Sequence, residues 1–126
     1  MAKTESIFAP SAEQLDIAVL ALPRASILEV ASVLDPLRNA NRQLGREAFR
    51  WRVVSPDGAP VPLTCGIELP SHGGLAAADG ADALIVISGY GQAEVATPAL
   101  IAGLRRNAGR FRALGGVDAG PWVLAR

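Results

Sequence analysis

A glycine-flanked segment near the end of the chain, Gly116-Val117-Asp118-Ala119-Gly120, is the clearest pointer to chemistry. Its spacing matches the nucleophile elbow, G-x-Nuc-x-G, in which small flanking residues let one side chain project from a strained turn between a strand and a helix. Asp118 occupies the nucleophile position. A simpler interpretation also stands, a tight turn in which the aspartate caps the following helix. Both interpretations place Asp118 at the carboxyl end of a strand.

A second segment, Ser88-Gly89-Tyr90-Gly91, directly follows a wholly apolar run and leaves its backbone exposed. We expect the N–H groups of Gly89, Tyr90 and Ala119 to form a small cradle for an anion, such as a ligand carboxylate. A cation would find π-faces in Tyr90 or Trp122, the aromatic residues nearest to the two strand ends. The alternative for Trp122 is burial under the sheet.

Few other residues suggest reactive groups. With one cysteine, Cys65, and one histidine, His72, the chain has neither an internal disulfide nor a zinc site built from Cys and His. We expect Cys65 to be a small buried apolar residue and His72 to lie in a solvated loop, and we expect no metal or cofactor. Twelve basic and twelve acidic residues give zero net charge, so no general attraction to nucleic acid or anionic lipid is predicted. A solvated helix end is expected to hold the basic cluster of Arg105, Arg106, Arg110 and Arg112.

The elements that must position these residues alternate along the chain. Strands are expected at residues 16–22, 49–55, 83–87 and 111–117. Ser26, with Glu29 three residues later, begins a helix with one apolar face, and Thr97-Pro98 begins another. Pro36 is expected to kink or restart the first helix. This alternation predicts an α/β domain with a mostly parallel sheet, in which ligands bind beyond the carboxyl ends of the strands.

The length of 126 residues limits the chain to one domain. Residues 1–15 are predicted to be a flexible leader and residues 16–126 a partial domain, because the short final helix cannot cover the last strand. The domain is therefore expected to be truncated at its C-terminal side or completed by a second copy. No apolar run approaches the roughly 20 residues that cross a bilayer, and the start MAKTES does not resemble a signal peptide, so a cytoplasmic location is expected.

Several segments together resemble the DJ-1/PfpI superfamily: DIAVLALP, the helix with Glu29 followed by Asp35 and Arg38, ALIVI with SGYG, and VDAGPWVLA. More narrowly, ILEVASVLDPLRNANRQLGREAFRWRVVSPDGAPV resembles the amidase-like N-terminal sensor domain of AraC-type (GlxA-like) transcriptional regulators. That group includes regulators of carnitine, glycine betaine and arginine catabolism. The resemblance covers residues 16–126 and implies a flavodoxin-like three-layer sandwich, as in class I glutamine amidotransferases.

The resemblance also implies roles for individual residues. In the superfamily the elbow carries a cysteine, supported by a glutamate of the first helix and a histidine further along the chain. The cysteine position falls on Asp118, the glutamate on Glu29 and the preceding glycine on Gly116, while the histidine has no counterpart. A carboxylate cannot do the work of a thiolate, so a pseudoenzyme is expected rather than an amidase. If Glu29 and Asp118 lie within a few ångströms, they would share a proton or bind a cation between them.

The implied function is a ligand-sensing and dimerisation domain of an AraC-type transcriptional regulator. Its effector would be a small cationic or zwitterionic metabolite, such as an amine, a quaternary ammonium compound or an amino acid. A homodimer is expected, without a membrane partner, and DNA would be contacted only through a helix-turn-helix region not present here. Two alternatives remain, a fragment of a DJ-1/PfpI-type amidase or hydrolase and a truncated oligomerisation module. The predicted ligand-binding residues are Glu29, Gly89, Tyr90, Gly91, Asp118, Ala119 and Trp122.

Overall fold

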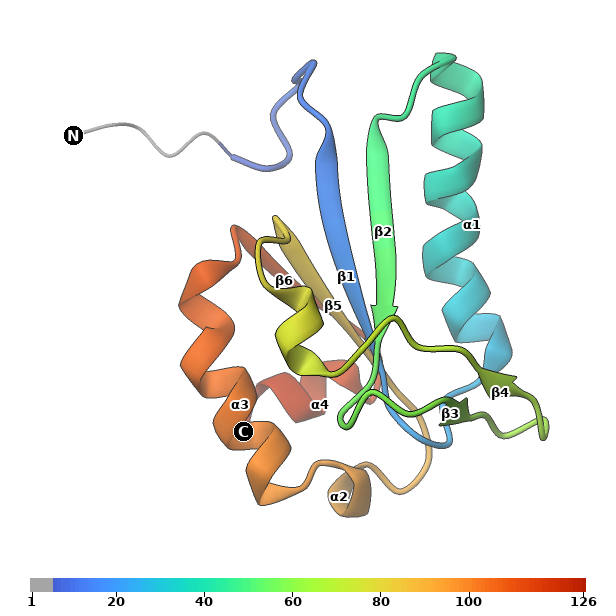
Figure 1. The fold of residues 1–126 in the computed structure, drawn as a ribbon, viewed down its shortest axis with the longest axis vertical. Coiled ribbons are helices and arrows are strands. Elements are labelled where there is room, and N and C mark those ends of the chain that lie inside the picture. Colours follow the sequence, from blue (N-terminus) through green and yellow to red (C-terminus); the bar gives the residue numbers. More distant parts are fainter. Residues whose placement is uncertain (1–5) are drawn as a thin grey trace.

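A four-stranded parallel sheet forms the centre of the computed structural model, which describes residues 6–126 (Figure 1). The strand order is β2-β1-β5-β6, and all three pairings are parallel. The four strands are β1 (Leu15–Ala21), β2 (Phe49–Val54), β5 (Ala83–Ser88) and β6 (Ala113–Asp118). The predicted α/β class with a mostly parallel sheet is therefore confirmed. The strand order reverses between β1 and β5, because β2 is added on one side of β1, and β5 and β6 are added on the other side. Folds of this kind bind ligands at the point where the strand order reverses.

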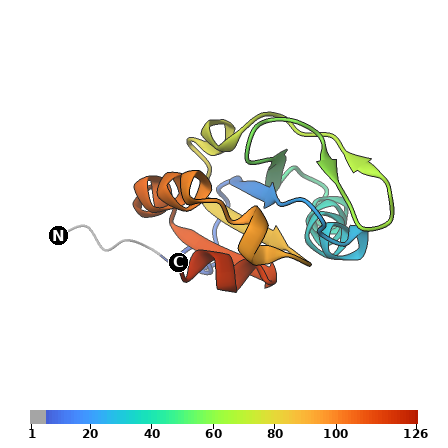
Figure 2. The ribbon, with the colours of Figure 1, turned by 90° about the horizontal axis from the view of Figure 1, so that it is seen from below.

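Helices cover both faces of this sheet, and Figure 2 shows α1 and α3 on opposite sides of it. Alternate strand residues point to opposite faces, which gives two apolar clusters. On one face, Val30 and Leu37 of α1 (Ile27–Leu44) pack near Val19. On the other, Leu100 of α3 (Pro98–Asn107) and Val123 of α4 (Gly120–Leu124) complete the cluster. The result is the three-layer arrangement that the resemblance implied.

The start of α1 is held by a capping box. The Ser26 N–H donates to the Glu29 carboxylate at 3.1 Å, and the Leu28 N–H donates to the Ser26 hydroxyl at 3.2 Å. The helix then continues through Pro36 to Leu44. The expected restart at Pro36 is wrong, because the packing of the apolar face against the sheet holds the helix together on both sides of the proline.

A short hairpin lies against the turn between β1 and α1. Its strands are β3 (Val61–Pro62) and β4 (Glu68–Leu69), which pair antiparallel. The Arg24 N–H donates to the Pro62 carbonyl at 2.9 Å, and the Thr64 N–H donates to the Ala25 carbonyl at 3.1 Å. Cys65 is exposed in the hairpin turn, so its expected burial is wrong: its neighbours bond through their backbones and leave the side chain outside.

Three single-turn elements complete the described part of the chain. They are the 3-10 turns Leu75–Ala78 and Ala108–Arg110 and the helix α2 (Gln92–Val95), which follows the glycine-rich segment after β5. The turn at Leu75–Ala78 agrees with the single helical turn that the sequence predicts there, whereas α2 was not predicted. A helix of four residues has too few apolar positions to produce a periodic pattern.

The segment before β1 lies over the amino ends of the strands. Residues 6–14 form turns and bends, and Ile7 packs against the same apolar cluster as α1. Between this segment and the sheet is a hollow of about 530 Å³, lined mainly by apolar residues. Residues 1–5 of the predicted flexible leader lie outside the described residues. Within residues 6–126, no helix combines the length and the apolar character that crossing a bilayer requires.

Candidate functional site

The turn after β6 has the geometry of an elbow. Asp118 has a φ of +54°, which is uncommon for a residue with a Cβ, and its side chain is exposed. A Cβ on Gly116 would lie 2.5 Å from the Pro121 nitrogen, and one on Gly120 would collide with the Val86 carbonyl. The simpler interpretation, an aspartate capping the last helix, is wrong, because the N-cap of α4 is Ala119 and no side chain caps it.

Glu29 and Asp118 interact, although 89 positions separate them in the chain. Burial raises the pKa of the Glu29 carboxyl, the Ser26 N–H lowers it, and a hydrogen bond and like charge from Asp118 raise it further, for a net increase. The first turn of α1 and the elbow after β6 thus bring two carboxyl groups together at the carboxyl edge of the sheet. Two such groups share a proton or accept a cation at lower cost than they both ionise.

Backbone donors near this pair are fewer than predicted. The Ala119 N–H donates to the Ser88 carbonyl at 2.8 Å and extends the β5–β6 ladder, so it is not available to a ligand. Gly89 is buried beside the elbow, and within the described chain the N–H groups of Gly89 and Tyr90 donate no backbone hydrogen bond. The predicted cradle of three amides is therefore corrected to two.

The two aromatic side chains, Tyr90 and Trp122, have different surroundings. Tyr90 is 78% exposed, at the tip of the turn after β5. Trp122 is half-buried against the core on the α3 and α4 face, and the Arg126 guanidinium lies 3.9 Å from its ring centroid. One π-face of Trp122 therefore already holds a cation from the chain itself. Its location agrees with the alternative of packing under the sheet.

Arg24 is a charged residue of this edge that the sequence analysis missed. It has a φ of +66°, and its guanidinium Nη2 lies 2.8 Å from a Glu94 carboxylate oxygen. A Cβ on Gly89 would lie 2.6 Å from the Arg24 carbonyl oxygen, and one on Gly91 would lie 2.5 Å from the Arg24 guanidinium. Gly89 and Gly91 indicated that another segment comes close to this turn. Their spacing did not indicate that this segment carries Arg24.

His72, Arg110 and Arg112 are engaged in other parts of the described chain. The His72 Nδ1 accepts a hydrogen bond from the Val53 N–H at 3.1 Å, and the residue is exposed, as predicted. Two residues of the arginine cluster form ion pairs, Arg110 with Asp79 at 3.6 Å and Arg112 with Asp82 at 3.4 Å. In residues 6–126, no group of three or more His, Cys, Asp or Glu side chains is placed to hold a metal ion.

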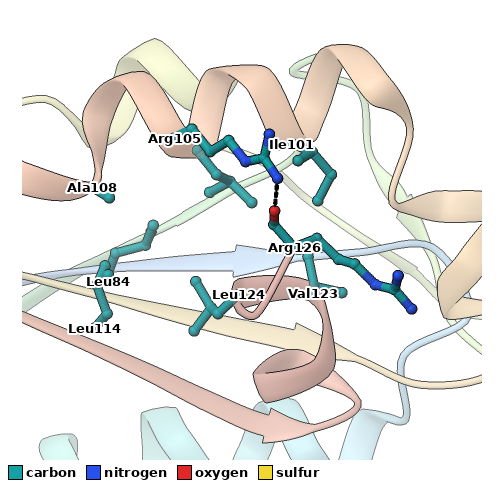
Figure 3. Close-up of a pocket in the computed structure, with 9 residues that line it drawn as sticks. Leu84, Ile101, Arg105, Ala108, Leu114, Val123, Leu124 and Arg126 are labelled. Carbon is teal, nitrogen blue, oxygen red and sulfur yellow. Dashed lines mark hydrogen bonds between the residues drawn. The ribbon is translucent and has the colours of Figure 1, made fainter.

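A small apolar hollow lies between α3, α4 and the strands β5 and β6 (Figure 3). Arg105 closes its rim by donating to the Arg126 carbonyl. Its volume is about 60 Å³, far below the 530 Å³ of the hollow at the amino ends of the strands. The carboxyl edge with Glu29 and Asp118 remains the place where charge is available to a ligand.

Curated relatives of the chain are transcriptional regulators, although no model of a known protein family matches it. The HTH-type transcriptional regulator CdhR of Pseudomonas aeruginosa is 38% identical over 110 residues, which cover 87% of this chain and 32% of that protein. GbdR of the same species is 36% identical over 110 residues, which cover 87% of this chain and 30% of that protein. The chain thus spans about a third of the length of these relatives.

Solved structures agree with this relationship. An AraC family transcriptional regulator from Pseudomonas putida is 28% identical with a TM-score of 0.76, covering 89% of this chain and 69% of that one. A ThiJ/PfpI family protein from Pseudomonas syringae has a TM-score of 0.68 at 15% identity, covering 88% and 45%. A DJ-1 superfamily protein from Agrobacterium tumefaciens has a TM-score of 0.65 at 24% identity, covering 88% and 57%. The chain is a homologue of AraC-type transcriptional regulators and has the fold of the DJ-1/PfpI superfamily.

Proposed function

We propose that this chain is the ligand-sensing and dimerisation domain of a cytoplasmic transcriptional regulator of the AraC type. In this proposal a separate helix-turn-helix region of the whole protein contacts DNA. A small cationic or zwitterionic metabolite binds at the carboxyl edge of the sheet, and its binding shifts a homodimer between two arrangements. Such a shift extends only as far as the ligand binds one arrangement better than the other.

The observation that carries the proposal is the approach of Glu29 to Asp118, which together with burial raises the pKa of Glu29. The two carboxyl groups concentrate negative charge at one exposed edge, while the guanidinium of Arg24, on the turn before α1, is engaged with Glu94. An ammonium, guanidinium or trimethylammonium group placed against the pair would relieve their mutual repulsion. The elbow would then serve to hold one carboxylate in position for binding.

The residues of the edge support binding more than catalysis. The elbow shape is shared with enzymes that use a nucleophile, and this favours the amidase or hydrolase alternative. However, the elbow residue Asp118 carries a carboxyl group and not a thiol. Cys65 lies in the β3–β4 hairpin, and Nδ1 of His72 is hydrogen-bonded to the backbone of β2. A thiolate mechanism would need a thiol and an imidazole at the same point.

Isothermal titration calorimetry with tetramethylammonium tests the proposal. The variant Asp118→Asn removes one charge and keeps the shape of the side chain, so affinity should fall about tenfold or more, as for loss of a charged partner. Asp35→Asn is the matched control, because it makes the same charge change at an exposed position of α1, where Asp35 pairs with Arg38 at 2.8 Å.

The control should retain the affinity of the unsubstituted chain. Unchanged affinity in Asp118→Asn would remove Asp118 from the site. Equal losses in Asp118→Asn and Asp35→Asn would show a general effect of net charge and would equally contradict the proposed site.

A further inference from the structure

Arg24 shares the backbone strain of Asp118. Among the described residues other than glycine, only these two have a positive φ, at +66° and +54°. Both stand at the carboxyl edge of the sheet, Arg24 between β1 and α1 and Asp118 at the end of β6. Strained backbone of this kind concentrates at ligand-contacting positions, where the surrounding structure holds it in place.

The backbone around Arg24 lies next to the residues that position Glu29 and Asp118. Two residues after Arg24, the Ser26 N–H donates to the Glu29 carboxylate at 3.1 Å. The Arg24 carbonyl packs against Gly89, and the preceding residue Ser88 lies opposite Asp118 in the sheet register. The turn that carries Arg24 is thus a direct neighbour of both halves of the carboxyl pair.

The ion pair between Arg24 and Glu94 is easily exchanged. The two side chains are 44% and 76% exposed, and exposed ion pairs contribute little because both charges stay hydrated. A guanidinium can donate two N–H groups to one carboxylate, so a ligand carboxylate competes for the same donors as Glu94. The N–H groups of Gly89 and Tyr90, which donate no backbone hydrogen bond in the described chain, lie on the same turn as Gly91, against which the guanidinium packs.

The same ion pair ties α2 to the turn after β1. In residues 6–126 it is the one ion pair that joins these two segments. The helix has four residues, and the amides of Glu94 and Val95 both bond to the Gly91 carbonyl. Pro23 and Val95, the neighbours of the paired residues, line a hollow of about 580 Å³ beside α3. Release of Glu94 would therefore loosen one wall of this hollow.

We propose that Arg24 binds the carboxylate of a zwitterionic ligand whose cationic group sits on Glu29 and Asp118, and that this exchange releases Glu94 and loosens α2. The inference rests on the proposed function for the cationic half of the ligand. It adds the anionic half, which selects zwitterions over simple cations, and a local conformational response to binding.

The test compares trimethylglycine with tetramethylammonium, which carry the same cationic group with and without a carboxylate. In calorimetry, Arg24→Gln should bind trimethylglycine about tenfold more weakly, as expected for loss of a charge-assisted contact, and tetramethylammonium no more weakly than the unsubstituted chain does. Glu94→Gln, which removes the competing carboxylate, should bind trimethylglycine up to about fivefold more tightly. Arg38→Gln is the matched control, an exposed arginine of an ion pair on α1.

Hydrogen exchange provides the second measurement. Trimethylglycine should accelerate exchange of the amides of Glu94, Val95 and Ala96, which are bonded within α2, and tetramethylammonium should not. Equal loss of trimethylglycine affinity in Arg24→Gln and Arg38→Gln, or no loss in either, would overturn the role of Arg24 and leave the carboxyl pair as a cation site. If the unsubstituted chain binds neither compound, the proposed ligand class is wrong and this inference falls with it.

Discussion

The two ends of the sheet use acidic residues in opposite ways. At the amino end, Asp16 lies 2.6 Å from the Arg52 guanidinium, and Asp82 accepts a hydrogen bond from the Asp16 N–H at 2.9 Å and lies 3.4 Å from Arg112. At the carboxyl end, Glu29 meets another acid, Asp118, while the guanidinium of Arg24, on the turn before α1, is engaged with Glu94.

Backbone conformation also differs between the two ends of the sheet, with the strained residues at the carboxyl end. The carboxyl end holds the two residues other than glycine that have a positive φ in the described chain, together with glycines that leave no room for a Cβ. The amino end has regular strand starts and an apolar hollow. Charges that satisfy each other stabilise the fold, whereas charges that repel each other on a strained backbone have a structural cost, which is why we propose the carboxyl end as the binding site.

The largest expected effect is the loss of the elbow. Gly120→Ala would place a methyl group against the Val86 carbonyl, which belongs to a buried strand and has little freedom to move. We expect the free energy of unfolding to fall by about 2–3 kcal/mol, measured by urea denaturation. Gly109→Ala is the control, because Gly109 has no neighbour within reach of a Cβ and no positive φ. Similar losses in both variants would mean that the elbow is not the tightly built element described above.

A smaller effect is expected at the amino end. Asp16→Asn leaves the Arg52 guanidinium, whose side chain is only 23% exposed, without its carboxylate partner. Loss of a partly buried charge pair should lower the free energy of unfolding by about 1–2 kcal/mol. Asp35→Asn breaks an exposed pair and should lower the urea midpoint much less than Asp16→Asn does. If Asp16→Asn is no less stable than Asp35→Asn, the acids at the amino end do not stabilise the fold.

The smallest effect is the pH dependence of the carboxyl pair. Burial and Asp118 hold the pKa of Glu29 above its ordinary value of 4.5, so the folded chain binds this proton more tightly than the unfolded chain. The stability that Glu29 contributes is therefore complete below about pH 4.5 and is lost as pH rises through the raised pKa. We expect urea denaturation from pH 4 to pH 8 to show this in Glu29→Gln. The free energy of unfolding of the variant, relative to that of the unsubstituted chain, should increase as pH rises.

The matched comparison for this pH dependence has the opposite sign. Arg38 lowers the pKa of Asp35, so Asp35 contributes stability above its ordinary pKa of 3.8 that is lost as pH falls through the lowered value. Asp35→Asn should therefore approach the unsubstituted chain at low pH rather than at high pH. A pH dependence of the same sign in both variants would contradict the contact between Glu29 and Asp118.

Much of the fold could be predicted because its signals are local. Wholly apolar runs indicated strands buried on both faces, Ser26 with Glu29 indicated a helix start, and the glycines around Asp118 indicated an elbow. The failures occurred where a short-range rule met long-range packing. Pro36 lies inside α1 because the helix packs on the sheet, and Cys65 is exposed because its hairpin bonds through its backbone.

For the candidate site, the sequence by itself determined which residue stands at the elbow, since a tight turn between a strand and a helix requires small residues at fixed spacing. Only the tertiary structure decided which groups meet there. Parallel pairing of β1, β5 and β6 places their carboxyl ends side by side, and this brings Glu29 to Asp118 and Arg24 to a partner 70 residues away. Such contacts depend on strand order and register, which no short stretch of sequence contains.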